Sequence, residues 1–217
     1  MLNGNTLLIT AGPTWEAIDP VRGITNHSSG KMGYALARSA AELGAQVILV
    51  SGPVCLPPPK GMETIAVSSA LDMYQAVHRQ LQEHSVDVFI GVAAVADYRP
   101  ADIQPQKIKK SSDALTLRLV KNPDIVASVA ALEHRRPYTV GFAAETEHLE
   151  AYARGKLENK KLDMIIANDV SREGTGFGSD SNHALLITAE HTLDSGHVSK
   201  SELAHKILQH IEHELRR

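Results

Sequence analysis

The chain has 217 residues, which is long enough for one large α/β domain with a substantial core. Hydrophobic residues make up 43%, charged residues 22%, and the formal net charge is −3, so composition gives no sign of nucleic-acid or membrane partners. Cys55 is the only cysteine, which excludes a disulfide within the chain and a cysteine-based zinc site. Without a signal-peptide pattern or a bilayer-length apolar run, we expect a cytoplasmic protein.

The first half of the chain alternates short apolar runs with helical patterns. The runs that indicate strands are Thr6–Ala11, Gln46–Val50, Glu63–Val67 and Val86–Val92. The helical patterns are Ser29–Leu43, with Met32, Leu36, Ala40 and Leu43 on one face, and Ser69–His84, with Leu71, Tyr74, Val77 and Leu81 on one face. Gly44 suits the cap of the first helix. This alternation predicts an α/β fold with a Rossmann-like, doubly wound, mostly parallel sheet.

The second half begins with a polar segment, Tyr98–Ser112, that we interpret as a projecting arm reaching to about residue 120. Ala114–Val120 alternates like a half-buried strand, and Pro123 suits the first turn of a short helix. The remaining predictions are strands at Tyr138–Ala143 and Leu162–Ala167, a helix over Thr146–Lys160, a hairpin of Ala184–Ala189 and Thr192–Val198 turning at Asp194–Gly196, and a last helix over Ser199–Leu215. We expect one domain over residues 1–217.

The turn between the first strand and the first helix has the composition of an anion site. Gly12 ends the strand, and Ser28, Gly30 and Gly33 open the helix, where backbone N–H groups and the positive helix end attract a phosphate. The stretch fits neither the dinucleotide fingerprint nor the Walker A pattern. A plain serine cap with packing glycines is the competing interpretation.

Other polar groups follow the strands and could bind the same ligand. Gly91, Val92, Ala93 and Ala94 end a buried strand where small residues let a ligand approach the backbone, and Asp97 could accept its hydrogen bonds. Arg22 could clamp an anion, although a surface arginine is equally compatible with the pattern. Lys107, Lys109 and Lys110 could fold over a triphosphate, and Lys156 and Lys160 share one helix face.

Tyr152 and Lys156 also form the Tyr-x-x-x-Lys pattern of short-chain dehydrogenases. The glycine-rich cofactor turn of that class is missing after the first strand, so this alternative rests on analogy alone.

Taken together, the motifs resemble those of phosphopantothenoylcysteine synthetase, the ligase of coenzyme A biosynthesis, in its bacterial, CTP-dependent type. The matching stretches span nearly the whole chain in the order of the family: Thr10–Thr14, Asp19–Arg22, Asn26–Gly33, Ala93–Asp97, Lys107–Lys110, Lys121–Val126, Gly141–Thr146 and Ala167–Val170. Gly23 departs from the family, because an aromatic residue is expected after Arg22.

The resemblance implies a reaction in two halves. The carboxylate of 4′-phosphopantothenate attacks the α-phosphate of CTP and releases pyrophosphate, and the amine of cysteine then displaces CMP to form the amide. Magnesium would accompany CTP through ligands that the sequence does not identify. A homodimer is implied, whereas flavin and the decarboxylase domain often fused to this ligase are not expected here. A nucleotide-binding module without ligase activity is the alternative from another class.

The resemblance also assigns roles to individual residues. Asn26 would act on the acyl-nucleotidylate, and Lys107 would serve the first half-reaction. The residues expected at the nucleotide are Gly12, Ser28, Gly30, Gly33, Gly91, Val92, Ala93, Asp97, Lys107, Pro123, Asp124, Ile125, Val126, Phe142, Lys156, Lys160 and Asn168. The residues expected at the phosphopantothenate are Arg22, reaching into a neighbouring subunit, and Asn26, Ala93, Ala94 and Asp97.

Overall fold

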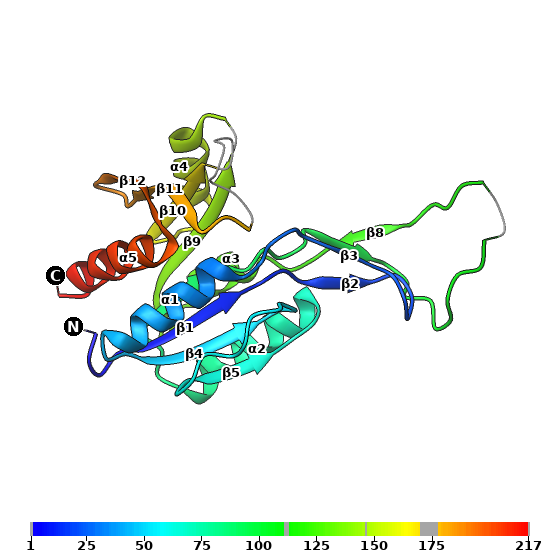
Figure 1. Ribbon diagram of the computed structural model, residues 1–217, viewed down its shortest axis with the longest axis horizontal. Coiled ribbons are helices and arrows are strands. Elements are labelled where there is room, and N and C mark those ends of the chain that lie inside the picture. The colour runs from blue at the N-terminus through cyan, green and yellow to red at the C-terminus, as the bar shows by residue number, and fades with distance from the viewer. Residues whose placement is uncertain (1, 111–112, 146, 170–177, 217) are drawn as a thin grey trace.

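The computed structural model describes residues 2–110, 113–145, 147–169 and 178–216, and its centre is an eight-stranded sheet (Figure 1). The strand order is β12-β11-β10-β9-β6-β1-β4-β5, in which the six strands from β10 to β5 are parallel and β11 and β12 are antiparallel. The strands are β1 (Thr6–Ala11), β4 (Gln46–Ser51), β5 (Glu63–Ala66), β6 (Val88–Gly91), β9 (Tyr138–Glu145), β10 (Met164–Asp169), β11 (Ser181–Ile187) and β12 (Thr192–Ser199). The predicted doubly wound, mostly parallel sheet is confirmed.

Helices cover both faces of this sheet. One face carries α1 (Lys31–Glu42) and α5 (Lys200–Leu215), whose apolar residues share a core cluster with alternate residues of the strands. The other face carries α2 (Ala70–Glu83), α3 (Ile125–Ala130) and α4 (Leu149–Asn159), which pack on the opposite side chains of the same strands. Gly44, with φ +87°, follows α1 and donates its N–H to the Ala41 carbonyl, which confirms the predicted cap.

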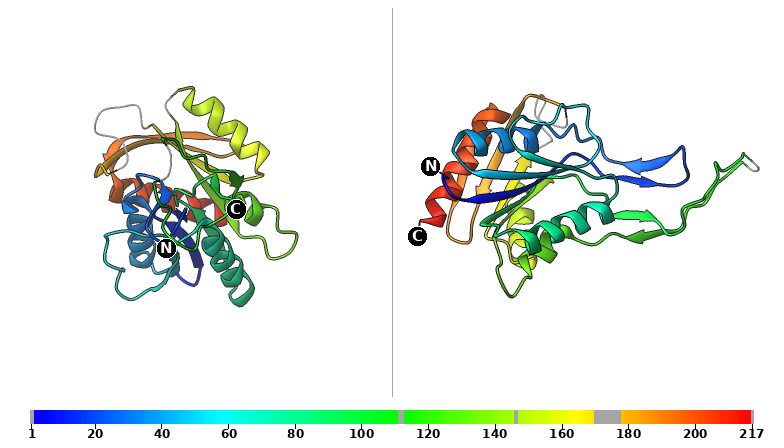
Figure 2. Two further views of the ribbon diagram at one scale, coloured as in Figure 1. Left: turned by 90° about the vertical axis from the view of Figure 1, so that its right-hand side faces the viewer. Right: turned by 90° about the horizontal axis from the view of Figure 1, so that it is seen from below.

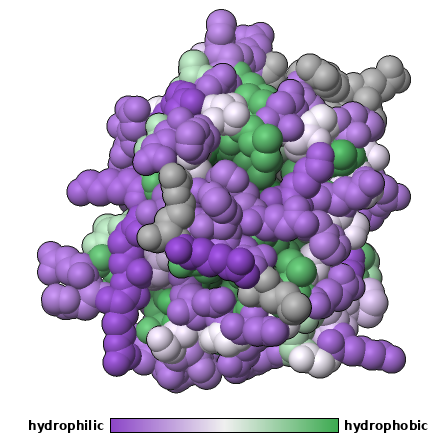
Figure 3. Space-filling model, turned by 90° about the vertical axis from the view of Figure 1, so that its left-hand side faces the viewer, coloured by the Kyte–Doolittle hydropathy of each residue, from purple (hydrophilic) through white to green (hydrophobic). Residues whose placement is uncertain are grey.

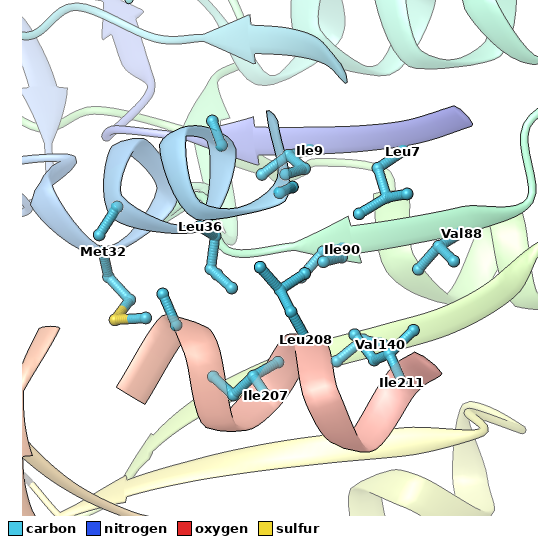
Figure 4. Close-up of a cluster of buried hydrophobic side chains, with 14 of the residues drawn as sticks. Leu7, Ile9, Met32, Leu36, Val88, Ile90, Val140, Ile207, Leu208 and Ile211 are labelled. Atoms are coloured by element: carbon cyan, nitrogen blue, oxygen red, sulfur yellow. The ribbon is translucent and has the colours of Figure 1, made fainter. Parts of the chain in front are cut away.

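The core under α1 and α5 holds these helices against the sheet (Figure 4). Ile9 of β1 and Ile90 of β6 meet Leu36 of α1 and Leu208 of α5, and all four side chains are fully buried. Burying a side chain of this kind stabilises the fold by about 1.5–3 kcal/mol relative to leaving it exposed. Such packing fixes where both helices begin, which matters because the candidate site lies at their N-termini.

Two helix predictions need correction at single positions. Leu71 is 37% exposed in α2, whereas Val77 of the predicted face is buried together with Ala70 and Met73. Ser69 caps α2 with a capping box, and Ala70, the first helical residue, is buried. Leu215 is likewise 37% exposed, because it is the last residue of α5 and extends past the sheet. The helix predicted from Thr146 begins at Leu149, and Thr146 itself lies outside the described residues, as does Val170.

The predicted hairpin turn at Asp194–Gly196 is wrong. The chain turns at residues 188–191, where the Thr188 N–H donates to the His191 carbonyl, and β12 runs on through Asp194–Gly196. The strand pairing is irregular between His183 and Leu185, and the buried Ser195 hydroxyl accepts the Ala184 N–H at 2.9 Å. The Asp-Ser-Gly sequence therefore forms a bulge within the strand.

The arm projects from the carboxyl ends of the parallel strands as two hairpins (Figures 1 and 2). One pairs β2 (Trp15–Ala17) with β3 (Gly23–Thr25), and the other pairs β7 (Tyr98–Pro100) with β8 (Leu119–Lys121). The strand predicted at Ala114–Val120 is thus shortened to β8. The alternating apolar side chains of the predicted strand have no core to cover in the arm, and Leu115, for example, is 57% exposed.

Away from the arm, the opposite face of the molecule is predominantly hydrophilic, with hydrophobic side chains showing only in separate areas (Figure 3). Within the described residues, none of the helices combines the length and the apolar character needed to cross a bilayer.

Candidate functional site

A cleft opens where the sheet order changes direction, between β1 and β6. The segments that follow these strands stay joined: the Ala94 N–H donates to the Gly12 carbonyl at 2.9 Å, and the Thr14 N–H donates to the Ala94 carbonyl at 3.3 Å. The Thr10 hydroxyl accepts the N–H groups of Val92 and Ala93, both at 3.2 Å. In doubly wound sheets this switch point is where ligands bind.

The N-terminus of α1 forms one wall of the cleft. Gly30 occupies the N-cap position with φ +76°, and none of the described side chains caps the helix. Ser28 instead accepts the Gly30 N–H at 3.3 Å. The competing interpretation, a plain serine cap, therefore does not hold, and the N–H groups of the first turn are left for another acceptor.

Small residues bring this helix end close to the strand. A Cβ atom at Gly33 would lie 2.5 Å from Ala11 Cβ and 3.2 Å from the Thr10 carbonyl oxygen. At Gly30 and at Gly12, a Cβ would come within 2.7 Å and 2.8 Å of Val54 Cγ1. Because no side chain fits at these positions, a ligand in the cleft can approach the backbone directly.

The cleft brings together nine of the residues predicted for the site. They are Gly12, Ser28, Gly30, Gly33, Val92, Ala93, Ala94, Phe142 and Asn168. Four further polar side chains in the lining were not among the predicted site residues: Ser29, Lys31, Asn182 and Lys200. Asn182 and Lys200 come from β11 and α5, which the sequence pattern did not connect with the phosphate motif.

Asn26 lies directly before the turn predicted to bind phosphate, and its amide reaches the segment after β6. Its Nδ2 donates to the Ala94 carbonyl at 2.9 Å. This contact joins the helix end of α1 to the segment after β6, so the residues predicted for phosphate and those predicted for the acyl substrate meet at one point.

A second group of predicted residues lies on the α3–α4 side of the sheet and does not line the cleft. Asp124 caps α3 by accepting the Ala127 N–H at 3.0 Å, and Lys160 of α4 forms an ion pair with it at 2.8 Å. A Cβ at Gly91 would lie 2.4 Å from Val126 Cγ2, so these two residues pack closely. The remaining members of this group are Asp97, Pro123, Ile125 and Lys156.

One backbone and one side-chain hydrogen bond from Asn122 tie this second group to the segment after β6. The Asn122 N–H donates to the Asp97 carbonyl at 2.8 Å, and Asn122 Nδ2 donates to the Ala96 carbonyl at 2.8 Å. The two groups of predicted residues thus flank the same strand ends from opposite faces of the sheet.

Arg22 and Lys107 occupy the arm, where they line a separate concavity with Ile108 to Lys110. Arg22 donates to the buried Asp19 carboxylate at 2.6 Å and to the Ile108 carbonyl at 3.0 Å, while the Ile108 N–H donates to Asp19 at 3.1 Å. The Arg22 hydrogen bonds hold the pKa of Asp19 well below its usual range. Asp19 and Arg22 together fix the segment that carries Lys107.

Lys31 and Lys200 meet the chain just before β11. Lys31 forms an ion pair with Asp180 at 2.7 Å and donates to the Gly178 carbonyl at 2.9 Å, and Lys200 donates to the Ser179 carbonyl. Burial lowers the pKa of Lys200, and the nearby Lys31 charge adds to this effect. Lys31, for which the sequence motif indicated no role, therefore contributes charge to the cleft.

Tyr152 and Lys156 do not form a dehydrogenase-like pair in the cleft. Tyr152 is 53% exposed on α4 and its ring contacts His148 edge to face, and neither residue lines the cleft. Among the described residues, no three His, Cys, Asp or Glu side chains gather as a metal site.

Comparison with known proteins places the chain in a family. Residues 2–215 match the model of the DNA/pantothenate metabolism flavoprotein C-terminal domain. Coenzyme A biosynthesis bifunctional protein CoaBC of Vibrio parahaemolyticus is 60% identical over 211 residues, covering 96% of this chain and 52% of that protein. The CoaBC of Vibrio cholerae is 57% identical over 216 residues, covering 99% and 53%.

The fold agrees with a solved relative. The crystal structure of the C-terminal domain of a CoaBC protein superimposes with a TM-score of 0.83 at 43% identity, covering 99% of both chains. The chain spans about half the length of the bifunctional relatives. Sequence and fold together show that it belongs to the DNA/pantothenate metabolism flavoprotein C-terminal domain family.

Proposed function

We propose that this chain is a phosphopantothenate–cysteine ligase that uses CTP. The observation that carries the proposal is the hydrogen bond between Asn26 Nδ2 and the Ala94 carbonyl, because it joins an uncapped helix end suited to phosphate with a strand end suited to an acyl substrate. Membership of a family whose relatives are named for coenzyme A biosynthesis supports the same assignment.

The reaction needs a carboxylate to become a good acyl donor. The carboxylate oxygen of 4′-phosphopantothenate forms a bond to the α-phosphorus of CTP, and the bond to pyrophosphate breaks. The cysteine amine then attacks the acyl carbon of this mixed anhydride, loses a proton, and displaces CMP. The N–H groups of the first turn of α1, at Gly30 to Gly33, would hold the phosphate oxygens throughout.

Asn26 and Lys107 would act in different halves of this sequence. Asn26 Nδ2 would donate to the acyl oxygen as negative charge develops there, a step for which its position beside Ala94 is suited. Lys107 would neutralise the charge on the pyrophosphate leaving group in the first half. Lys107 and Arg22 line the same concavity of the arm. In a homodimer, the arm of one chain would bring both residues to the cleft of the other chain.

The choice of CTP and the role of magnesium belong to the proposal as well. Phe142 and the backbone at Ala93 line the cleft and would contact the nucleotide. Magnesium would be held mainly by triphosphate oxygens and water, because it needs only one or two protein carboxylates beside a nucleotide.

The decisive experiment measures pyrophosphate release by the purified chain with CTP, 4′-phosphopantothenate and cysteine. We expect release that depends on 4′-phosphopantothenate, with phosphopantothenoylcysteine as the product, and faster turnover with CTP than with ATP. A reaction without 4′-phosphopantothenate is the control for hydrolysis. If no nucleoside triphosphate gives release although CTP binds, the chain is a nucleotide-binding module without ligase activity.

A further inference from the structure

One end of the cleft carries polar groups that the proposed chemistry does not use, apart from Asn168, which the family resemblance places at the nucleotide. Lys31 and Lys200 line it together with Asn168 and Asn182. The phosphate-binding turn accounts for Gly12 to Gly33 and the acyl side for Ala93 and Ala94, which leaves this end without a ligand.

Strand register places the two asparagines on one face of the sheet. Asn168 of β10 is the direct partner of Ala184 in β11, and Asn182 precedes Ala184 by two residues. Ala184 and Ile166 belong to the core under α1 and α5, so Asn168 and Asn182 point to that side as well. Both side chains therefore meet the helix ends that form the wall of the cleft.

Each of these asparagines has an unused acceptor. The Oδ1 atoms of Asn168 and Asn182 are buried, and none of the described residues donates a hydrogen bond to either. Asn182 is only 3% exposed, and its Nδ2 faces the Met32 sulfur at 4.0 Å, which turns Oδ1 away from Met32. A buried acceptor without a donor costs about 1–3 kcal/mol, so these oxygens call for a ligand that carries N–H groups.

Positive charge lies beside these acceptors. Lys200 is 9% exposed at the first residue of α5, and Lys31 is the first residue of α1. The uncapped N-terminal end of α1 and two ammonium groups therefore lie close together, where an anion would be stabilised. Lys31 is ion-paired with Asp180, whereas Lys200 donates to the neutral Ser179 carbonyl and feels the Asp180 charge only at longer range, so Lys200 is the cation left for a ligand.

We propose that this end of the cleft binds an α-amino acid, with Lys200 holding its carboxylate and the Asn168 and Asn182 oxygens accepting N–H groups of its amine. The alternative ligand, a terminal phosphate of the nucleotide, would use the lysines but offers no N–H group to the two oxygens. The inference rests on the proposed function, in which cysteine is the amino acid. The helix end that holds the phosphates would then lie beside the amine that attacks the acyl carbon.

Lys200→Gln tests the carboxylate contact. Cysteine and cysteamine share a thiol and an amine, but cysteamine lacks the carboxylate. The wild type should have the higher kcat/KM with cysteine. The variant should lose roughly 10- to 100-fold in kcat/KM with cysteine and little with cysteamine, as expected for one charge-assisted hydrogen bond. Pyrophosphate release in the first half-reaction should stay unchanged.

Two further variants keep the test specific. Asn182→Leu removes the acceptor but not the cations, so it should lower kcat/KM with cysteine and with cysteamine by the same factor. Lys206→Gln on the same helix is the matched control, because its ammonium donates to the Ser195 carbonyl outside the cleft and both amines should react normally. Thermal unfolding and CTP titration of each variant identify a folding defect.

The outcomes separate this inference from the proposed function. Pyrophosphate release by the wild type tests the ligase itself and does not depend on Lys200. A wild type that reacts equally well with cysteine and cysteamine would overturn the amino-acid subsite. So would a Lys200→Gln variant that loses CTP affinity and first-step release, which would assign the lysine to the terminal phosphates, or one that loses the same factor with both amines.

Discussion

At the scale of single residues, the site depends on side chains that connect elements distant in sequence. Asn26 reaches Ala94, Lys31 reaches Asp180, and Asp19 binds both Arg22 and the backbone of Ile108. The role expected of Asn26 came from the family resemblance, because its residue type alone indicates only a polar group beside a possible phosphate turn. The sequence could not predict Lys200 or Asn182, because a lysine at the start of a helix and an asparagine in a strand have many ordinary uses.

Asn26→Asp should separate the two half-reactions. The aspartate has no N–H group for the developing acyl oxyanion and repels it, so pyrophosphate release should persist while product formation falls by roughly 100-fold or more. Mass spectrometry should detect acyl-cytidylate that accumulates on the variant. Asn159→Asp, an exposed position in α4, is the control and should behave as the wild type. Normal product formation by Asn26→Asp would remove this residue from the mechanism.

At the scale of elements, the spacing of apolar residues predicted the sheet and the helices, because burial of one face imposes that spacing. Runs that are apolar on both faces indicate that β1, β4 and β6 are buried parallel strands. The capping boxes at Ser69 and Ser199 mark the starts of α2 and α5. Periodicity failed where tertiary contacts decide. Ser195 joins a bulge because its hydroxyl satisfies the Ala184 N–H, and the alternating residues around Leu115 face solvent in the arm.

Gly33→Ala tests how closely α1 must approach β1. The new methyl group would lie 2.5 Å from Ala11 Cβ and 3.2 Å from a backbone oxygen, so the helix end must move away from the strand. We expect a loss of about 1–3 kcal/mol in the free energy of unfolding, and weaker CTP binding because the first-turn N–H groups are displaced. Urea unfolding and CTP titration measure the two effects.

Gly155→Ala is the matched control for that variant. Gly155 lies inside α4 with nothing within 4 Å of its added Cβ, so alanine should raise the free energy of unfolding by about 0.5–1 kcal/mol and leave CTP affinity unchanged. If both glycine variants behave alike, close packing at Gly33 is not what positions the phosphate-binding turn.

At the scale of the whole molecule, the predicted site residues fall into three places: the cleft, the α3–α4 side of the sheet, and the arm. Motif order along the chain could not predict this division, because Arg22 and Asn26 are near neighbours in sequence, yet Arg22 lines the concavity of the arm and Asn26 hydrogen-bonds Ala94 of the cleft. An arm that projects from the body (Figure 2) supports the proposal that its residues serve the cleft of a second copy.

Mixing two inactive variants tests this arrangement. If Arg22 acts in the partner's cleft, Arg22→Gln and Asn26→Asp chains should each be inactive, yet recover activity when unfolded and refolded together, because a mixed dimer contains one cleft with both residues intact. Two arm variants, Arg22→Gln and Lys107→Gln, should not complement each other. Mixtures of Arg22→Gln and Asn26→Asp that stay inactive, while native mass spectrometry with one isotope-labelled chain shows mixed dimers, would place Arg22 in the cleft of its own chain.

Val54, which packs against Gly12 and Gly30, places a useful chemical handle near the cleft. Cys55, the sole thiol of the sequence, follows Val54 directly and is exposed. An environment-sensitive dye attached there would sit one residue from the wall of the cleft without any engineered mutation. Ligand entry, pyrophosphate departure and product release could then be followed in real time by fluorescence on a single, chemically uniform sample.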